Sequence, residues 1–451
     1  MKLPRPKLSK SIARKLLVTV AVLVVYRFMA TVPIPGVDAQ AFQDTFGDTP
    51  FTNIYSLISG GRLDKPTIVA IGIAPYINAS IIMQLLQTVV PKLEELRKEG
   101  ESGRNKINQY TRLLTVPLAL IQSIMIYTIL TNPEITGGAV GNVIQPLTGI
   151  ELVTFVITLT TGSIILMWLG ELITEHGLGN GASLIITFGI LATLPSLITS
   201  DITGLNADFE QVRAGNLDFL TSNSFLLFYV ILAIVVGMTF IIVYGNEAMK
   251  KIPILHARRY RGDASSGVEN FLPIRLNPAG VIPVIFAQAM LTFPQIISSF
   301  ILSIREAGRL YDFALDLQNS PIFLFNTWEY VVLFGLMTFG FTYFYTFVIV
   351  KPEEIAKNLQ KSGAYIPGVR PGTATIDYLN QTTIRLTLFG GTFLAGISVV
   401  PIIVSIIEGS GTLTILSGIG GTSLLIIVSV FMDSYRKAQA LSSFESYDEF
   451  K

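Results

Sequence analysis

Apolar runs of about 20 residues recur along the whole chain and alternate with shorter polar segments. A helix needs about 20 apolar residues to cross the hydrocarbon core of a bilayer. The pattern therefore predicts an all-α polytopic membrane protein. The ten predicted transmembrane helices are Leu16–Val32, Ile68–Val90, Arg112–Leu130, Leu152–Ile173, Ala182–Ser200, Phe225–Tyr244, Ala279–Ile304, Tyr330–Val350, Ile384–Ile407 and Leu413–Met432.

The stretch Phe51–Pro91 departs from this pattern in its first half. Ile54, Leu57 and Ile58 form a short apolar face, which Gly60-Gly61 then breaks before three charged residues. We expect a short helix that enters the membrane and turns back, followed by a spanning helix from about Ile68. Backbone that does not span survives at membrane depth only where protein buries it or where it lines a watery cavity. This stretch therefore predicts a cavity, with the other helices as its wall.

The amino-acid composition indicates a membrane protein and excludes chemistry that depends on cysteine. The chain has 451 residues, of which 50% are hydrophobic and 14% charged, against roughly a quarter charged in soluble proteins. It has no cysteine, which excludes disulfides, thiolate metal sites and cysteine nucleophiles. The basic N-terminal segment looks like the start of a signal peptide, but the apolar run after it is too long and has no clear cleavage site. We expect it to be the first span.

Lysine and arginine are distributed unequally between the two sides of the predicted bundle. With the N-terminus inside, 26 of the 32 basic residues are inside, five are outside, and Arg27 lies within the first span. The positive-inside rule therefore predicts that both termini are cytoplasmic. The two long inside loops are 245–278, whose pattern suits a hairpin off the membrane, and 351–383. In the second, Tyr365, Ile366 and Pro367 precede Arg370, a composition common at protein interfaces. The alternative is that these loops are solvated and only orient the helices.

Motifs for catalysis are absent from the sequence, which contains no zinc-protease motif, nucleophile elbow or phosphate-binding lysine loop. Gly177–Ala182 matches a loose dinucleotide motif, but it follows a membrane helix, so a tight turn is the better interpretation. Polar residues inside the spans are mostly uncharged, which argues against an ion-coupled transporter. Ile73 and Ile77 share a helix face, as do Ile186 and Ile190. They are ordinary core or lipid-facing residues unless their helices surround a cavity, where they would form a dewetting gate.

Seven motifs in order along the chain resemble the bacterial SecY family, the channel subunit of the protein translocase. They are PIPGVD at 33–38, GIAPYINASIIMQLL at 72–86, KEGESGRNKINQYTR at 98–112, GELITEHGLGNGAS at 170–183, LNPAGVIPVIFA at 276–287, KSGAYIPGVRPG at 361–372 and GGTSLLIIVSVFMD at 420–433. The resemblance covers nearly the whole chain. It implies an hourglass pore between two pseudo-symmetric five-helix halves, residues 1–200 and 201–451.

The resemblance also assigns residues. It implies a plug at about 53–63 that includes Ile54, Tyr55, Leu57, Ile58, Gly60 and Gly61. It implies a pore ring of Ile73, Ile77, Ile186, Ile190, Ile285 and Ile426. The lateral gate between spans two and seven would place Asn78 and Gln84 opposite Ala289 and Phe293. Arg258, Arg259, Arg261 and Arg370 would dock the motor ATPase SecA or the ribosome.

The implied function is passage of unfolded polypeptides across the bacterial plasma membrane and release of apolar segments sideways into lipid. The expected partners are the small subunits SecE and SecG, SecA, the ribosome, signal sequences, nascent chains and membrane lipids. No enzyme activity, metal or cofactor is expected, and energy would come from SecA, the ribosome or the proton motive force. Two alternatives stay open: a secondary transporter with broken helices, and an export channel or insertase for one dedicated substrate.

Overall fold

The computed structural model describes residues 10–35, 37, 67–131, 147, 149–195, 223–256, 271–304, 308–324, 327–408 and 421–448. The predicted plug, 53–63, and the three arginines Arg258, Arg259 and Arg261 lie outside the described residues. Each of the ten predicted spans overlaps a helix in the described part. They are α1 (Lys10–Met29), α4 (Ala74–Val89), α6 (Glu101–Thr131), α7 (Ile150–His176), the helix Gly181–Pro195, α9 (Asn223–Glu247), α10 (Ile282–Ile304), α12 (Trp328–Ile349), α14 (Thr373–Glu408) and α16 (Gly421–Asp448).

Shorter elements connect these helices. They are α5 (Pro91–Lys98), α11 (Arg309–Gln318), α13 (Pro352–Lys361), and the strands β1 (Met249–Pro253), β2 (Leu255–His256), β3 (Phe271–Arg275) and β4 (Ala364–Tyr365). Strands β1 and β3 pair antiparallel, with Met249 opposite Arg275. The hairpin predicted for 245–278 is thereby confirmed.

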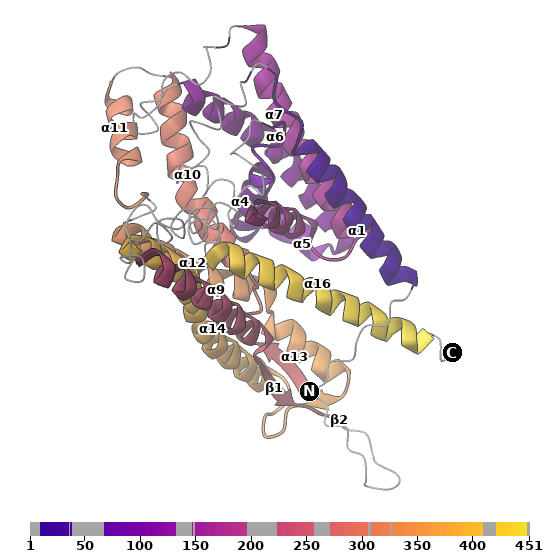
Figure 1. The fold of residues 1–451 in the computed structure, drawn as a ribbon. Coiled ribbons are helices and arrows are strands. Elements are labelled where there is room, and N and C mark those ends of the chain that lie inside the picture. The colour runs from indigo at the N-terminus through magenta and orange to yellow at the C-terminus, as the bar shows by residue number, and fades with distance from the viewer. Residues whose placement is uncertain are drawn as a thin grey trace.

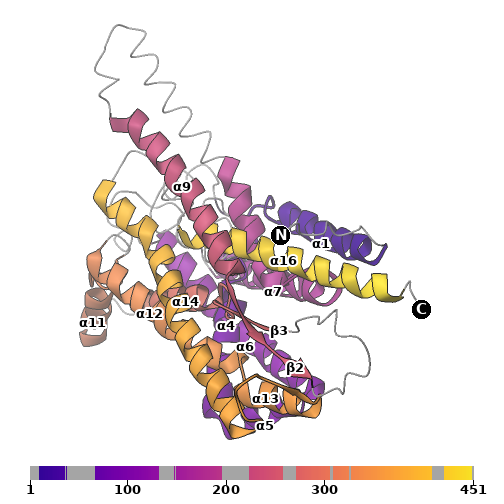
Figure 2. The ribbon, with the colours of Figure 1, turned by 90° about the horizontal axis from the view of Figure 1, so that it is seen from below.

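The helices fall into two groups in Figure 1. The indigo to magenta helices α1 to α7 lie together, the later helices α9, α12 and α14 form a second group, and α16 runs between the two. Within the first group α4 packs on α6, and α6 on α7; within the second α12 packs on α14, and α16 on α9. Figure 2 shows the end of α16 projecting beyond the bundle beside α1, and these two helices are in contact.

Several predicted boundaries are wrong: α4 and α6 start elsewhere for local reasons, α14 begins at Thr373 instead of Ile384, and α16 continues to Asp448 beyond Met432. The second span was expected to be helical from Ile68, but Ile68–Ile73 forms turns and α4 begins at Ala74. Gly72 has φ 66°, and Pro75 is accommodated only in the first helical turn. The third span was expected to begin at Arg112, whereas α6 begins at Glu101. Hydropathy marks only the part of a helix that lies in lipid, and α6 continues into its polar segment.

Candidate functional site

The turns before α4 are covered by small residues of α7. Ser163 donates a hydrogen bond to the carbonyl of Gly72, with an Oγ–O distance of 2.6 Å. A Cβ atom at Gly162 would lie 1.9 Å from the carbonyl oxygen of Ile68, so only glycine allows this approach. Irregular backbone within a membrane protein must be satisfied by protein neighbours. Here α7 provides that cover and fixes the point where the second span begins.

Glycines also bring α7 against the helix Gly181–Pro195. A Cβ at Gly181 would lie 1.8 Å from the carbonyl oxygen of Gly170. The backbone NH of Gly181 donates to Thr174 Oγ1 at 2.9 Å, and the Leu178 NH donates to Thr19 Oγ1 of α1 at the same distance. The motif GLGNGA at 177–182 is therefore a tight turn, as expected, that binds three spans together.

The six isoleucines of the predicted ring belong to one hydrophobic cluster. Five are buried and Ile285 is partly buried against the cluster. They come from four places in the fold: the start of α4 (Ile73, Ile77), the helix Gly181–Pro195 (Ile186, Ile190), α10 (Ile285) and α16 (Ile426). Both halves of the chain therefore contribute branched apolar side chains to the same core. Such a core can close a channel without any charged or polar group.

The side chain of Ile73 also lies close to α7, outside its own helix. A Cβ at Gly170 would lie 3.3 Å from Ile73 Cδ1 and 3.4 Å from Ile185 Cδ1. The glycine in α7 thus leaves room for the tips of both isoleucines. Ile185 was not among the residues that the sequence pointed to, although it is fully buried in the same cluster.

The residues of the predicted lateral gate belong to α4 and α10. Asn78 and Ala289 are buried, and Gln84 and Phe293 are half-buried. Helix α10 makes its main contact with the first half through α6. The structure therefore joins the seventh span to the first half mainly through the third span, and the predicted α4–α10 gate stays a prediction.

A second part of the seam joins α4 and α5 to α12. The side chain of Gln84 makes a polar interaction with the hydroxyl of Tyr345, which is buried against Phe286 of α10 with ring centroids 5.5 Å apart. In α5, the polar helix that follows α4, Arg97 donates from Nη2 to the carbonyl oxygen of Val348 at 3.1 Å. That carbonyl is in the last turn of α12, where no helical NH remains to bond it. Arg97 therefore caps a helix of the opposite half.

Charged residues at the start of α13 lie near the contact between Arg97 and the Val348 carbonyl. Lys351 and Glu354 form an ion pair at 2.7 Å at the start of α13. The pKa of the exposed Glu354 carboxyl is lowered, mainly by its hydrogen bond to Lys351, with smaller contributions from the charges of Lys351 and Arg97. Arg97 and Tyr345 were missed from the sequence because no periodicity or motif marks a contact between residues about 250 positions apart.

We expect Arg97→Gln to weaken this seam. Loss of a charge-assisted hydrogen bond at a half-exposed position costs about 1 kcal/mol, or a roughly fivefold shift from closed to open seam. Spin labels at Leu93→Cys and Lys357→Cys, in a chain without native cysteine, report the α5–α13 distance by double electron–electron resonance. The matched control is Arg104→Gln, an exposed arginine of α6. Identical distance distributions for R97Q, R104Q and the parent would remove Arg97 from the seam.

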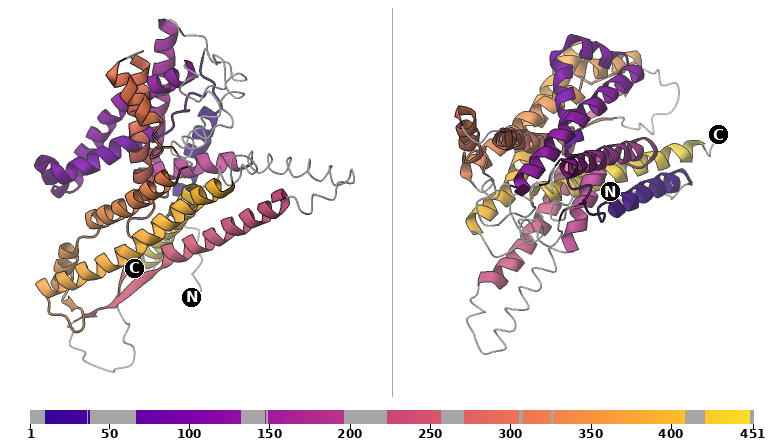
Figure 3. Two further views of the ribbon diagram at one scale, coloured as in Figure 1. Left: turned by 90° about the vertical axis from the view of Figure 1, so that its left-hand side faces the viewer. Right: turned by 90° about the horizontal axis from the view of Figure 1, so that it is seen from above.

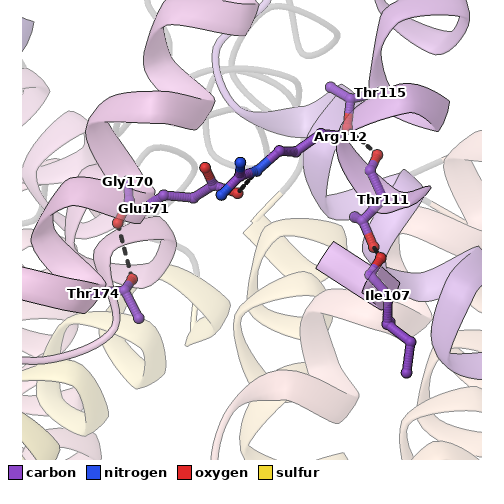
Figure 4. A network of polar contacts seen from close by, with 7 residues as sticks. All are labelled: Ile107, Thr111, Arg112, Thr115, Gly170, Glu171 and Thr174. Carbon is purple, nitrogen blue, oxygen red and sulfur yellow. Dashed lines mark hydrogen bonds and ion pairs between the residues drawn. The ribbon is translucent and has the colours of Figure 1, made fainter. Parts of the chain in front are cut away.

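An ion pair joins the third and fourth spans near the polar end of the bundle (Figure 4). Arg112 Nε of α6 lies 2.8 Å from Glu171 Oε1 of α7, with side chains 41% and 17% exposed. Thr174 donates to the carbonyl of Gly170 at 2.8 Å, one turn along α7. The pair therefore lies beside the turn that positions the helix Gly181–Pro195.

Glu171→Ala is expected to lower the free energy of unfolding by about 1 kcal/mol, since a charge-assisted bond is lost but one partner is partly solvated. A thermal unfolding scan in detergent measures this. Glu175→Ala is the control, because the Glu175 side chain is 64% exposed. A melting temperature in E171A equal to that in E175A would show that the pair contributes nothing.

The loop that carries Arg370 has its own small core. A separate cluster joins Ile252 and Ile274 of the β1–β3 hairpin, Ala356 of α13, Ile366 directly after β4, and Leu379 of α14. Strand β2 pairs with β4, with Leu255 opposite Tyr365. The two inside loops predicted from the sequence are thus one structural unit, with the hairpin visible at the lower edge of Figure 1.

Arg370 is exposed on this unit while its backbone is fixed. Ile366 is 2% exposed and serves as the anchor. Thr375 Oγ1 donates to the Arg370 carbonyl at 2.9 Å. Gly368 and Gly372 on either side have φ of 79° and 108°, which favours glycine. Arg258, Arg259 and Arg261 come shortly after β2, but they lie outside the described residues.

Comparison with known proteins places the chain in one family. The SecY family model matches residues 67–435. The protein translocase subunit SecY of Buchnera aphidicola is 39% identical over 446 residues, which is 98% of this chain and 95% of the relative. That of Escherichia coli K12 is 39% identical over 439 residues, or 96% and 93% of the two chains.

Solved structures show the same fold. A structure described as a protein conducting channel has a TM-score of 0.63 at 19% identity and covers 97% of this chain and 94% of its own. Sec61 in a canine ribosome-channel complex has a TM-score of 0.60, with the same identity and coverage. In the part of the chain that the structure describes, ten helices overlap the ten predicted spans, as expected from the sequence. On the strength of the family model and the near-full-length relatives, the chain belongs to the SecY family.

Proposed function

We propose that this chain is the central channel of a protein translocase, which passes unfolded polypeptides through the bacterial plasma membrane. One observation carries the proposal: branched apolar side chains from both halves meet in a single cluster, in a chain whose relatives are named as translocase subunits. An unfolded polypeptide has no fixed shape or charge, so a stereospecific site cannot accommodate it. A ring of apolar side chains yields to any sequence and excludes ions when empty.

The seam between the halves supports sideways release. Beside the packing of α10 on α6, polar contacts of Gln84 with Tyr345 and of Arg97 with the Val348 carbonyl cross the seam. An apolar signal sequence that entered between the helices would replace these contacts with hydrophobic ones and expose itself to lipid. We propose that the plug, residues about 53–63, moves at the same time.

The driving force comes from outside the chain in this proposal. SecA or a ribosome docks on the unit formed by the β1–β3 hairpin, α13 and the Arg370 loop, with Arg258, Arg259 and Arg261 beside it. Proton motive force is a further energy source, and SecE and SecG are the small subunits that complete the channel. The 26 basic residues counted on this side of the predicted bundle support a cytoplasmic location of both termini.

Depletion of the protein tests the function against a channel for one dedicated substrate. We expect many secreted precursors to accumulate within one or two generations, as measured by proteomics of uncleaved signal peptides. Re-expression of the parent chain restores export. Accumulation of a single precursor would instead identify a dedicated channel, and accumulation of none would contradict the proposal.

A further inference from the structure

The short helix α11, which follows the seventh span, has three distinct faces. Ala314 is fully buried, and Tyr311 and Gln318 are half-buried on the same side. Leu310 and Phe313 are 50% and 59% exposed on the adjoining side, next to Leu317. Arg309, Asp312 and Asp316 are exposed on the remaining side. At 100° per residue, the apolar strip lies between the protein-facing side and the charged side.

The helix is attached firmly to the seventh span. It packs along α10, and Figure 3 shows the two helices next to each other in both views. After α11 the chain returns toward α12, and Gln295 of α10 donates from Nε2 to the carbonyl of Phe323 at 2.5 Å. The orientation of the exposed strip is therefore fixed relative to the bundle.

Apolar residues are also exposed in the chain that follows α11. The return segment exposes Ile322 and Leu324, and α12 then begins with Trp328, which is 54% exposed. Tryptophan is enriched where a membrane helix meets the water interface. Further along α12, Val332 and Leu336 are exposed apolar residues, as expected of a helix that contacts acyl chains. The exposed strip on α11 is thus followed along the chain by exposed apolar residues of the kind that contact lipid.

The charges on α11 limit how deep it can lie. Arg309, Asp312 and Asp316 on one side are incompatible with the bilayer centre but suit the headgroup region. The β1–β3 hairpin precedes α10 and α11 follows it, so one membrane crossing separates them. Figure 1 accordingly shows α11 at the end of the molecule opposite the hairpin.

We propose that α11 is an interfacial anchor, which inserts Leu310, Phe313 and Leu317 into the lipid surface on the side opposite the hairpin. The anchor ties the end of α10, one of the gate helices of the proposed channel, to the headgroup layer. When α10 separates from the first half, it moves together with α11. The lipid surface then restrains this movement in addition to the protein contacts. The partner is the lipid surface itself, and the anchor is independent of whether the channel transports polypeptides.

Single-cysteine variants test the anchor directly, since the parent has no cysteine. Leu310→Cys and Phe313→Cys probe the apolar strip, and Asp312→Cys and Asp316→Cys are matched controls on the charged side. Each full-length variant is labelled with a nitroxide in phosphatidylcholine nanodiscs. Collision rates are then measured with oxygen, which concentrates in lipid, and with a water-soluble nickel chelate.

The anchor predicts an oxygen-to-nickel ratio that is severalfold higher at positions 310 and 313 than at 312 and 316. Because each side is probed at two positions, the comparison can still be made if one variant fails to fold. Equal ratios at all four positions would show that α11 is solvated and would overturn the proposal. Exclusion of both reagents from positions 310 and 313 would also overturn it, because a protein surface would then cover the strip.

Discussion

Replacement of Ile190 by asparagine is expected to make the resting channel leak ions and to let precursors with defective signal sequences through. Ile190 is 2% exposed in the cluster that contains all six ring isoleucines. An amide that hydrogen-bonds water stabilises a wetted waist by about 1–3 kcal/mol, which raises permeation roughly 5- to 150-fold. Conductance in planar bilayers and export of a signal-defective reporter measure the two effects. The same direction is expected for Ile77, Ile285 and Ile426.

The control for this prediction separates a pore effect from a packing effect. Ile185 lies on the same helix, is fully buried in the same cluster and is not assigned to the ring. Ile185→Ala and Ile190→Ala both remove buried methyl groups and should lose a similar stability, about 2–5 kcal/mol. Only I190A should leak. If both leak alike, or neither does, the ring assignment is wrong.

Arg370→Glu is expected to reduce SecA-driven transport by about thirtyfold, while the protein stays folded. Truncation of an arginine at the centre of an interface costs about 2 kcal/mol or more, and reversal of its charge adds repulsion. The fold is unaffected because the side chain is exposed and the loop is held by Ile366 and by the Thr375 bond to the Arg370 carbonyl. ATP-dependent uptake of a precursor into proteoliposomes measures the loss.

Lys361→Glu provides the matched control for Arg370. Lys361 is an exposed residue at the end of α13 and undergoes the same change of charge. Its uptake should stay within about twofold of the parent, as for rim charges. Normal uptake in R370E, or an equal loss in K361E, would show that the Arg370 tip is not a specific docking point.

The ten spans could be predicted from the sequence because a helix that crosses lipid must be apolar over about 20 residues. Hydropathy averaged over such a window detects this directly. The ends of the helices could not. Helix α14 begins at Thr373, although the apolar run starts near Ile384, because its polar first turns pack in the small core around Ile366 and Leu379. The start of α4 was shifted by Gly72 and Pro75, whose local effects hydropathy ignores.

The isoleucines of the ring were assigned through family motifs, since their spacing alone also fits ordinary core residues. Tertiary packing brings these isoleucines together. Gly170 and Gly181 let α7 and the helix Gly181–Pro195 approach each other, and the sequence periodicity does not reveal that contact. The seam residues Arg97 and Tyr345 were missed for the same reason, because their partners lie in the opposite half. In the sequence, Arg97 is one of several basic residues between the second and third predicted spans.

Photocrosslinking from a stalled nascent chain tests the central claim most directly. A photoreactive amino acid is placed singly at the six ring positions and, as controls, at the lipid-exposed positions Val332 and Phe240. If the cluster is the waist of the channel, all six ring positions crosslink to the translocating polypeptide and the two controls crosslink to lipid alone. Crosslinks to the controls with none at the ring would show that polypeptides take another path.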